Sequence, residues 1–210
     1  MTEVINHPPF AIAIPGTMDT SVDIILLASG FSARFGPENK LLRPFHGKSL
    51  VGYALDLACS LRLGGEVLFV HAVTEVGSEA GGRPVRKIFN AHPEHGLRES
   101  VRLGVETSSA SYYLFIPCDQ PFLDRATIET IVSRRLPGRI VSPRCRGKPG
   151  NPTLFSAFFR QELLSLADGE SPRLLKRRHA DRVDWVEFEN PRPFRDIDTT
   201  EDFQALAEIF

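Results

Sequence analysis

The 210-residue sequence is poor in cysteine and has no excess of charge of either sign. Its three cysteines, Cys59, Cys118 and Cys145, are odd in number and widely spaced, which argues against a disulfide framework and indicates a reducing compartment. Because 25 basic residues oppose 26 acidic ones, the chain lacks the general positive field that holds nucleic acid or an acidic membrane without sequence preference. We therefore expect neither nucleic acid nor a membrane among its partners.

Long apolar runs are missing as well. No stretch is long enough to span a bilayer, and the first residues do not combine a charged start with the apolar segment of a signal peptide. Hydrophobic residues still make up 42% of the chain, which is enough for the core of one domain. We expect a cytoplasmic protein with a flexible or peripheral extension over residues 1–20 and a single domain over residues 21–210.

The fold class is predicted from alternation. Through residues 22–136, short runs rich in β-formers alternate with segments of helical periodicity, and this pattern is typical of an α/β fold in which helices cover both faces of a mostly parallel sheet. After Leu136 the pattern loosens and predicts a smaller α+β part, which we expect to form a lid or second wall. The predicted architecture thus has three layers, α/β/α.

Two nearly all-apolar strands, residues 23–28 and 112–117, run directly into polar loops. In open α/β sheets the ligand crevice lies beyond such carboxyl ends, so we expect the two loops to face each other. The first loop sets Arg34 and Lys40 among glycines, whose uncovered N–H groups could cradle phosphate oxygens. On spacing alone, an ordinary strand-to-helix loop with surface cations explains the pattern equally well.

The first loop also resembles the signature of a known family. The pattern LAxGxSxRxG followed by lysine is similar to that of the MobA-like NTP transferases, nucleotidyltransferases that act on the molybdenum cofactor. Further similar stretches follow in order, starting at Asn90, Pro117, Gly150, Asp168 and Asp196. In the first loop the matching residues are Leu27, Ala28, Gly30, Ser32, Arg34, Gly36 and Lys40.

This resemblance implies a Rossmann-like nucleotidyltransferase fold and assigns roles to residues. Arg34, Lys40 and Asp119 would be catalytic, and residues 21–136 and 137–210 would form the nucleotide and acceptor halves. Acceptor-binding residues would be Gly150, Asn151, Pro152 and Arg173. Nucleotide-binding residues would be Leu27, Ala28, Ser29, Gly30, Ser32, Asn90, Gly96 and Ser100.

A magnesium ion, or manganese, is the expected cofactor, because such ions neutralise charge that accumulates on transferring phosphates. The resemblance implies Asp119 and Asp198 as its ligands. Asp196 is the alternative, since residues two apart on an extended segment point the same way. Read without the resemblance, Asp119 could cap the following turn, and Asp198 could cap the last helix with Glu201.

The nucleotide base is predicted from one position. The cytidylyl branch of the family usually has alanine, and the guanylyl branch glycine, where this chain has Ser29. Because serine has a Cβ atom, it should crowd a purine more than glycine would, which favours CTP. The resemblance then implies transfer of CMP from MgCTP to the phosphate of the molybdenum cofactor, giving the cytosine dinucleotide form for an apo molybdenum hydroxylase.

Three alternatives to this function remain. The same fold could use GTP, or it could act on a sugar or alditol phosphate. The protein could instead be a molybdenum cofactor chaperone without catalytic activity. The cations of residues 144–148 and of the helix after Pro172 could equally belong to a solvated surface.

Overall fold

One eight-stranded sheet runs through the computed structural model, which describes residues 19–30 and 39–207. Its order is β10–β7–β9–β6–β1–β4–β5, and β8 pairs with β7. The strands are β1 Val22–Ala28, β4 Gly64–His71, β5 Arg86–Phe89, β6 Tyr112–Pro117, β7 Ile140–Cys145, β8 Lys148–Pro149, β9 Thr153–Ser156 and β10 Val183–Phe188. A separate hairpin joins β2 Pro44–Phe45 and β3 Lys48–Ser49.

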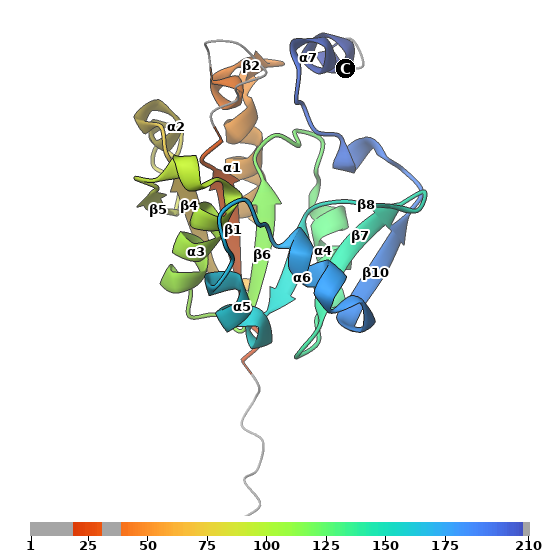
Figure 1. Cartoon of the computed structure of the whole chain (residues 1–210). Coiled ribbons are helices and arrows are strands. Elements are labelled where there is room, and N and C mark those ends of the chain that lie inside the picture. Colours follow the sequence, from red (N-terminus) through yellow and green to blue (C-terminus); the bar gives the residue numbers. More distant parts are fainter. Residues whose placement is uncertain (1–18, 31–38, 208–210) are drawn as a thin grey trace, which may run out of the picture.

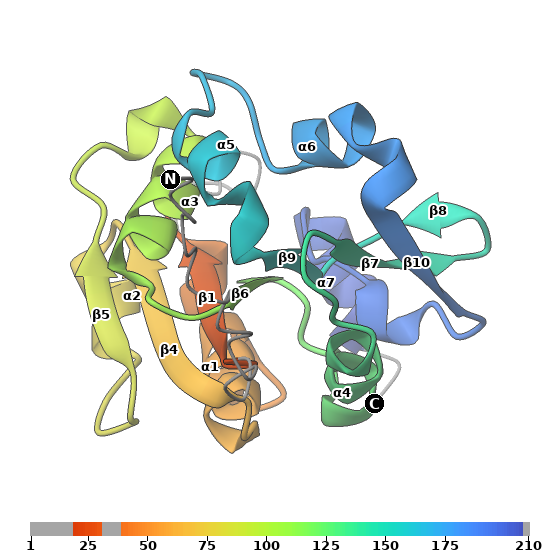
Figure 2. The same cartoon turned by 90° about the horizontal axis from the view of Figure 1, so that it is seen from below.

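Helices cover both faces of this sheet (Figures 1 and 2). They are α1 Leu50–Ser60, α2 Thr74–Ser78, α3 Leu97–Thr107, α4 Arg125–Ser133, α5 Arg160–Leu164, α6 Arg173–Arg178 and α7 Thr200–Ala207. Short 3-10 turns are η1 Lys40–Leu42, η2 Pro93–His95, η3 Ala157–Phe159, η4 Ala180–Arg182 and η5 Arg192–Phe194. The predicted three-layer α/β/α architecture is confirmed.

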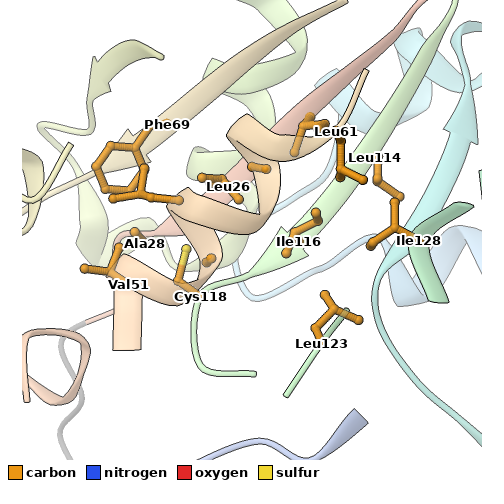
Figure 3. Packing of buried hydrophobic residues seen from close by; sticks show 14 of the residues in the cluster. Leu26, Ala28, Val51, Leu61, Phe69, Leu114, Ile116, Cys118, Leu123 and Ile128 are labelled. Carbon is orange, nitrogen blue, oxygen red and sulfur yellow. The ribbon is translucent and has the colours of Figure 1, made fainter. Parts of the chain in front are cut away.

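Alternate side chains of the central strands build two separate cores, because successive residues of a strand face opposite sides. On one face, Leu26 and Ile116 pack with apolar residues of α1 and α4. On the other, Ile25 and Phe115 pack with apolar residues of α3, α5 and α6. Figure 3 shows part of the first core, in which Cys118 is one of the packed side chains.

The two central strands place their loops as expected. Strands β1 and β6 are parallel neighbours, with Leu27 opposite Pro117, so their carboxyl ends lie side by side. The chain after each strand is therefore delivered to the same edge of the sheet. This edge carries the candidate active site.

In the later part of the chain, strands β7, β9 and β10 continue the same sheet. The sheet is mostly parallel, and β9 breaks the direction by pairing antiparallel with both β6 and β7. The division into nucleotide and acceptor halves remains a prediction.

The last two helices, α6 and α7, begin in different ways. Helix α6 begins after Pro172 and has no side-chain cap. At α7, Thr199 Oγ1 accepts from the Asp202 amide at 3.0 Å, and Asp202 Oδ2 accepts from the Thr199 amide at 2.9 Å. This reciprocal pair is a capping box, so Asp198 and Glu201 do not form one.

Candidate active site

The amino group of Lys40 lies between two of the predicted metal ligands. Its Nζ is 2.9 Å from Asp119 Oδ2 and 2.9 Å from Asp198 Oδ1. The third donor of the ammonium reaches the Ile197 carbonyl, also at 2.9 Å. The structure thus joins residues 79 and 158 positions away from Lys40 in the sequence.

Local structure explains how these groups meet. Asp119 follows the end of β6, and its carbonyl accepts from the Ile197 amide at 3.0 Å. Ile197 is fully buried, which anchors the segment carrying Asp198 against the core. On the other side, Asn39 caps the η1 turn by accepting from the Leu41 amide, and this turn presents Lys40.

The charge of Lys40 is well defined. Burial opposes ionisation, but Asp119 and Asp198 outweigh it and raise the pKa of Lys40 above its usual range. The side chain, only 13% exposed, is therefore a permanent cation at neutral pH and cannot act as a general base. It can only neutralise negative charge, either of the carboxylates or of a bound phosphate.

Two buried oxygens beside this site lack a hydrogen-bond partner among the described residues. They are Asp119 Oδ1 and Gln120 Oε1. Buried acceptors without a donor are costly, and oxygen donors are the ligands that Mg²⁺ and Mn²⁺ prefer. The donor set of Asp119, Gln120 and Asp198 therefore fits a divalent cation. Gln120 was missed at the sequence level, although it directly follows Asp119.

Asp196 makes different contacts from Asp198. Its Oδ1 accepts from Gln120 Nε2 at 2.8 Å, whereas Asp198 contacts Lys40. Desolvation, followed by the nearby charge of Asp119, raises the pKa of Asp196 to about 6. Asp198 is thus the carboxylate that shares the Lys40 ammonium with Asp119. Asp196 is bonded to Gln120, next to Asp119 in the sequence.

Several predicted nucleotide-binding residues come together near the ends of β1 and β4. Asn90 is 1% exposed, donates to Ser100 Oγ at 3.3 Å, and accepts from the His92 amide at 2.9 Å. These bonds hold the turn that leads into α3, where Gly96 adopts a φ of 72° before the helix. Asn90 and Ser100 therefore shape this turn.

The remaining predictions for the first loop differ in what the structure describes. Ala28 is buried in the first core, so it could contact a nucleotide only through its backbone, whereas the partly buried Leu27 packs against the second core on the opposite face. Ser29 is 9% exposed and donates to the Val70 carbonyl at 3.4 Å, toward β4. Gly30 is exposed at the end of the described segment. Ser32, Arg34 and Gly36 lie outside the described residues.

The predicted acceptor residues line one cavity next to this site. The cavity has a volume of about 470 Å³. Gly150, Asn151 and Arg173 line it together with Gln120 and Asp196, whereas Pro152 follows in a cis peptide bond and is buried. Four cations line it, namely Arg146, Lys148, Arg173 and Arg195. Its charge suits a phosphorylated ligand.

The sequence is similar to those of known proteins. The sequence profile of the MobA-like NTP transferase domain matches residues 24–183. Nicotine blue oxidoreductase of Paenarthrobacter nicotinovorans is 28% identical over 87% of this chain and 94% of its own length. A probable molybdenum cofactor guanylyltransferase of Haloferax mediterranei is 29% identical over 63% of each chain.

Solved structures show the same fold. The structure of a nucleotidyl transferase from Methanothermobacter thermautotroptrophicus superposes with a TM-score of 0.80, covering 90% of this chain and 97% of that one at 22% identity. Among the described residues, no helix has the length and apolar composition needed to cross a membrane.

Proposed function

Because the chain belongs to the MobA-like NTP transferase family, we propose that it transfers CMP from MgCTP to the phosphate of the molybdenum cofactor and releases pyrophosphate. That it is a nucleotidyltransferase follows from the family. The nucleotide, the acceptor and the residue roles are the proposed part. The observation that carries them is the Lys40 cation held between Asp119 and Asp198, beside a cavity lined by four more cations.

In the proposed reaction, an oxygen of the acceptor phosphate forms a bond to the α-phosphorus of CTP. The bond from that phosphorus to the oxygen bridging to the β-phosphorus breaks, and pyrophosphate leaves with the electron pair. Because negative charge accumulates on the phosphates, the enzyme must mainly align the reactants and neutralise charge.

The residues divide this work. Asp119 and Asp198 would hold Mg²⁺ or Mn²⁺, with Asp196 as the alternative ligand, and the ion would supply positive charge against the phosphates. Lys40 keeps its proton and supplies positive charge to the triphosphate and the transition state, a role we also propose for Arg34. Ser29, Gly30, Asn90, Gly96 and Ser100 would shape the nucleotide side.

The acceptor side is the cationic cavity. Gly150 and Asn151 form its wall, and Arg173 lies where a phosphate oxygen of the acceptor could be bound. The cavity shares Gln120 and Asp196 with the surroundings of Asp119, so a phosphate bound there would approach the carboxylates. We propose that the product serves an apo molybdenum hydroxylase.

Pyrophosphate release tests this function. The protein is incubated with Mg²⁺, molybdenum-loaded molybdopterin and one of CTP, GTP, ATP or UTP, and the dinucleotide product is identified by mass. Release with CTP alone is the expected result. Release with GTP would overturn the base assignment and keep the mechanism. In a parallel reaction, a sugar or alditol phosphate replaces molybdopterin, and release there alone would overturn the proposed acceptor.

A second candidate function follows from the name of one relative. The Paenarthrobacter nicotinovorans protein that aligns with 87% of this chain is named an oxidoreductase. An oxidation or reduction consumes no triphosphate, so it would give no pyrophosphate in this assay. The absence of pyrophosphate release, combined with tight binding of the molybdenum cofactor, would support the chaperone alternative.

A further inference from the structure

Lys176 is a partly buried lysine without a carboxylate partner. Its Nζ donates to Ser142 Oγ at 3.1 Å and to Thr153 Oγ1 at 3.3 Å, both of which are neutral. No carboxylate of the described residues lies within 4.0 Å of it. Burying a cation without a counter-charge is unfavourable. The positive charge of Lys176 is therefore not balanced by a described carboxylate, and a bound anion would balance it.

The surroundings add to this charge. Arg173, one helical turn earlier on α6, also has no ion pair among the described residues, and its charge is near enough to Lys176 to affect the pKa of the lysine. Burial, and then Arg173, lowers that pKa to about 8, so most Lys176 side chains are still protonated at pH 7. Two neighbouring cations thus share one open space.

That space is a cavity of about 400 Å³. It is lined by Lys176, Arg173, Trp185, Pro149 and Gly150, together with Arg177, and by no carboxylate. Lys176 Nζ lies 5.9 Å from the centre of the Trp185 ring, which forms one wall. In contrast, the cavity next to Asp119 includes Asp196 and does not include Lys176 or Trp185. The two cavities adjoin and share Pro149, Gly150 and Arg173.

We propose that Lys176 binds an oxyanion against Trp185, in a subsite that borders the one for the attacking phosphate and shares Arg173 with it. Lysine and arginine side chains are the usual charged donors for a tetrahedral oxyanion. As an acceptor subsite, this inference rests on the proposed function. The ligand group would be a phosphate or an oxo-metal group at the end of the acceptor remote from the attacking oxygen.

Trp185 is the only tryptophan of the chain, so it reports on this cavity without any label. The full-length protein is titrated at pH 7 with inorganic phosphate and, separately, with molybdate. Binding is measured by calorimetry, and tryptophan emission is recorded at the same concentrations. We expect saturable binding of at least one anion, with a matching change in emission. The preferred anion identifies the ligand group.

Two substitutions locate the site. Lys176→Met should weaken anion binding roughly tenfold or more, because hydrogen bonds to a charged group are lost. Arg178→Met is the matched control: it removes the same charge from the same helix, but Arg178 pairs with Glu170 and does not line the cavity. It should leave the affinity within about twofold of wild type, given the small worth of exposed ion pairs.

Two results would overturn the proposal. They are the absence of binding by either anion to the wild type, and wild-type affinity in Lys176→Met. Thermal unfolding checks that the variant is folded, and Lys176→Gln replaces it if it is not. No nucleotide is present, so this outcome is independent of pyrophosphate release. In an active enzyme, Lys176→Met should also raise the acceptor KM more than it lowers kcat, as expected for a binding residue.

Discussion

Two cationic regions of this protein differ in how their charge is balanced. Lys40 is held by two carboxylates and a carbonyl, whereas Arg173 and Lys176 have no ion pair among the described residues. A cation surrounded by carboxylates marks a place where another cation could be bound. Cations without carboxylates mark a place for an anion. On the assignments proposed above, the first region would hold the metal ion and the second would hold an anion.

Removing the charge of Asp119, in the first region, should reduce turnover more than any other substitution considered. Asp119→Asn keeps the shape of the side chain but removes a proposed metal ligand, and we expect turnover to fall by at least roughly 10²-fold, as for loss of one transition-state stabiliser. Initial rates of pyrophosphate release measure this. Asp181→Asn, at an exposed position of η4, is the control. Wild-type turnover in folded Asp119→Asn would remove Asp119 from the mechanism.

The second region should depend on pH. Because the pKa of Lys176 is lowered to about 8, the side chain loses its proton as the pH rises through this value, and the anion subsite loses a charge. The groups that face it are Arg173, Ser142, Thr153 and Trp185, and none of them is a carboxylate, an imidazole or a thiol. Molybdate affinity should fall roughly tenfold from pH 7 to pH 9, following the protonated fraction.

Lys176→Arg separates this titration from other effects of pH. Arginine stays protonated throughout the range, so molybdate affinity in this variant should be nearly constant between pH 7 and pH 9. Molybdate suits the experiment because it remains a dianion over the whole range. An equal fall in affinity in wild type and Lys176→Arg would show that another group causes the pH dependence.

Replacing Lys40 should change metal binding and turnover in opposite directions. In Lys40→Met the ammonium no longer competes for Asp119 and Asp198, and two carboxylates are left without a counter-charge. Mn²⁺ binding without nucleotide, measured by electron paramagnetic resonance, should then tighten by roughly three- to tenfold. Turnover should fall, since the transition state loses a cation.

Lys48→Met is the matched control for this experiment. Lys48 pairs with Asp56 on α1 and not with Asp119 or Asp198, and its loss removes the same charge from the protein. Unchanged or weaker Mn²⁺ binding in Lys40→Met would mean that Asp119 and Asp198 do not hold the ion. The metal assignment would then pass to other oxygens.

Much of this arrangement is visible in the sequence. The buried strands that end at Ala28 and Pro117 were readable as apolar runs, and their parallel pairing brings Asp119 to the edge that Lys40 also reaches. The family resemblance assigned both residues. What it could not supply is that the lysine contacts both carboxylates, because this depends on how Ile197 anchors the last segment.

The anion subsite was not readable in the same way. In the sequence, Lys176 is one of four cations in the segment RLLKRR and suits a solvated helix face. Its burial depends on α6 packing over the sheet and on β10 pairing with β7, which places Trp185 nearby. The cap of α7 does not follow from spacing either: the sequence allowed Asp198 with Glu201, whereas the observed bonds pair Thr199 with Asp202.

The smallest expected effect concerns the base. Ser29 lies at the end of β1 and donates a long hydrogen bond of 3.4 Å to the Val70 carbonyl, so its side chain points toward β4. Ser29→Gly removes the Cβ atom and opens only part of the space that a purine would need. The ratio of kcat/KM for CTP to that for GTP should therefore fall by only about three- to tenfold, the scale of about one carbon atom in a pocket.

Ser29→Ala is the control, because it keeps the Cβ atom and removes only the hydroxyl group. If crowding by Cβ selects the base, Ser29→Ala should keep the wild-type ratio, and only Ser29→Gly should shift it. Equal shifts in both variants would assign the selection to the hydroxyl group and its bond to Val70. An unchanged ratio in both would place base recognition elsewhere, with the turn held by Asn90 and Ser100 as the next region to vary.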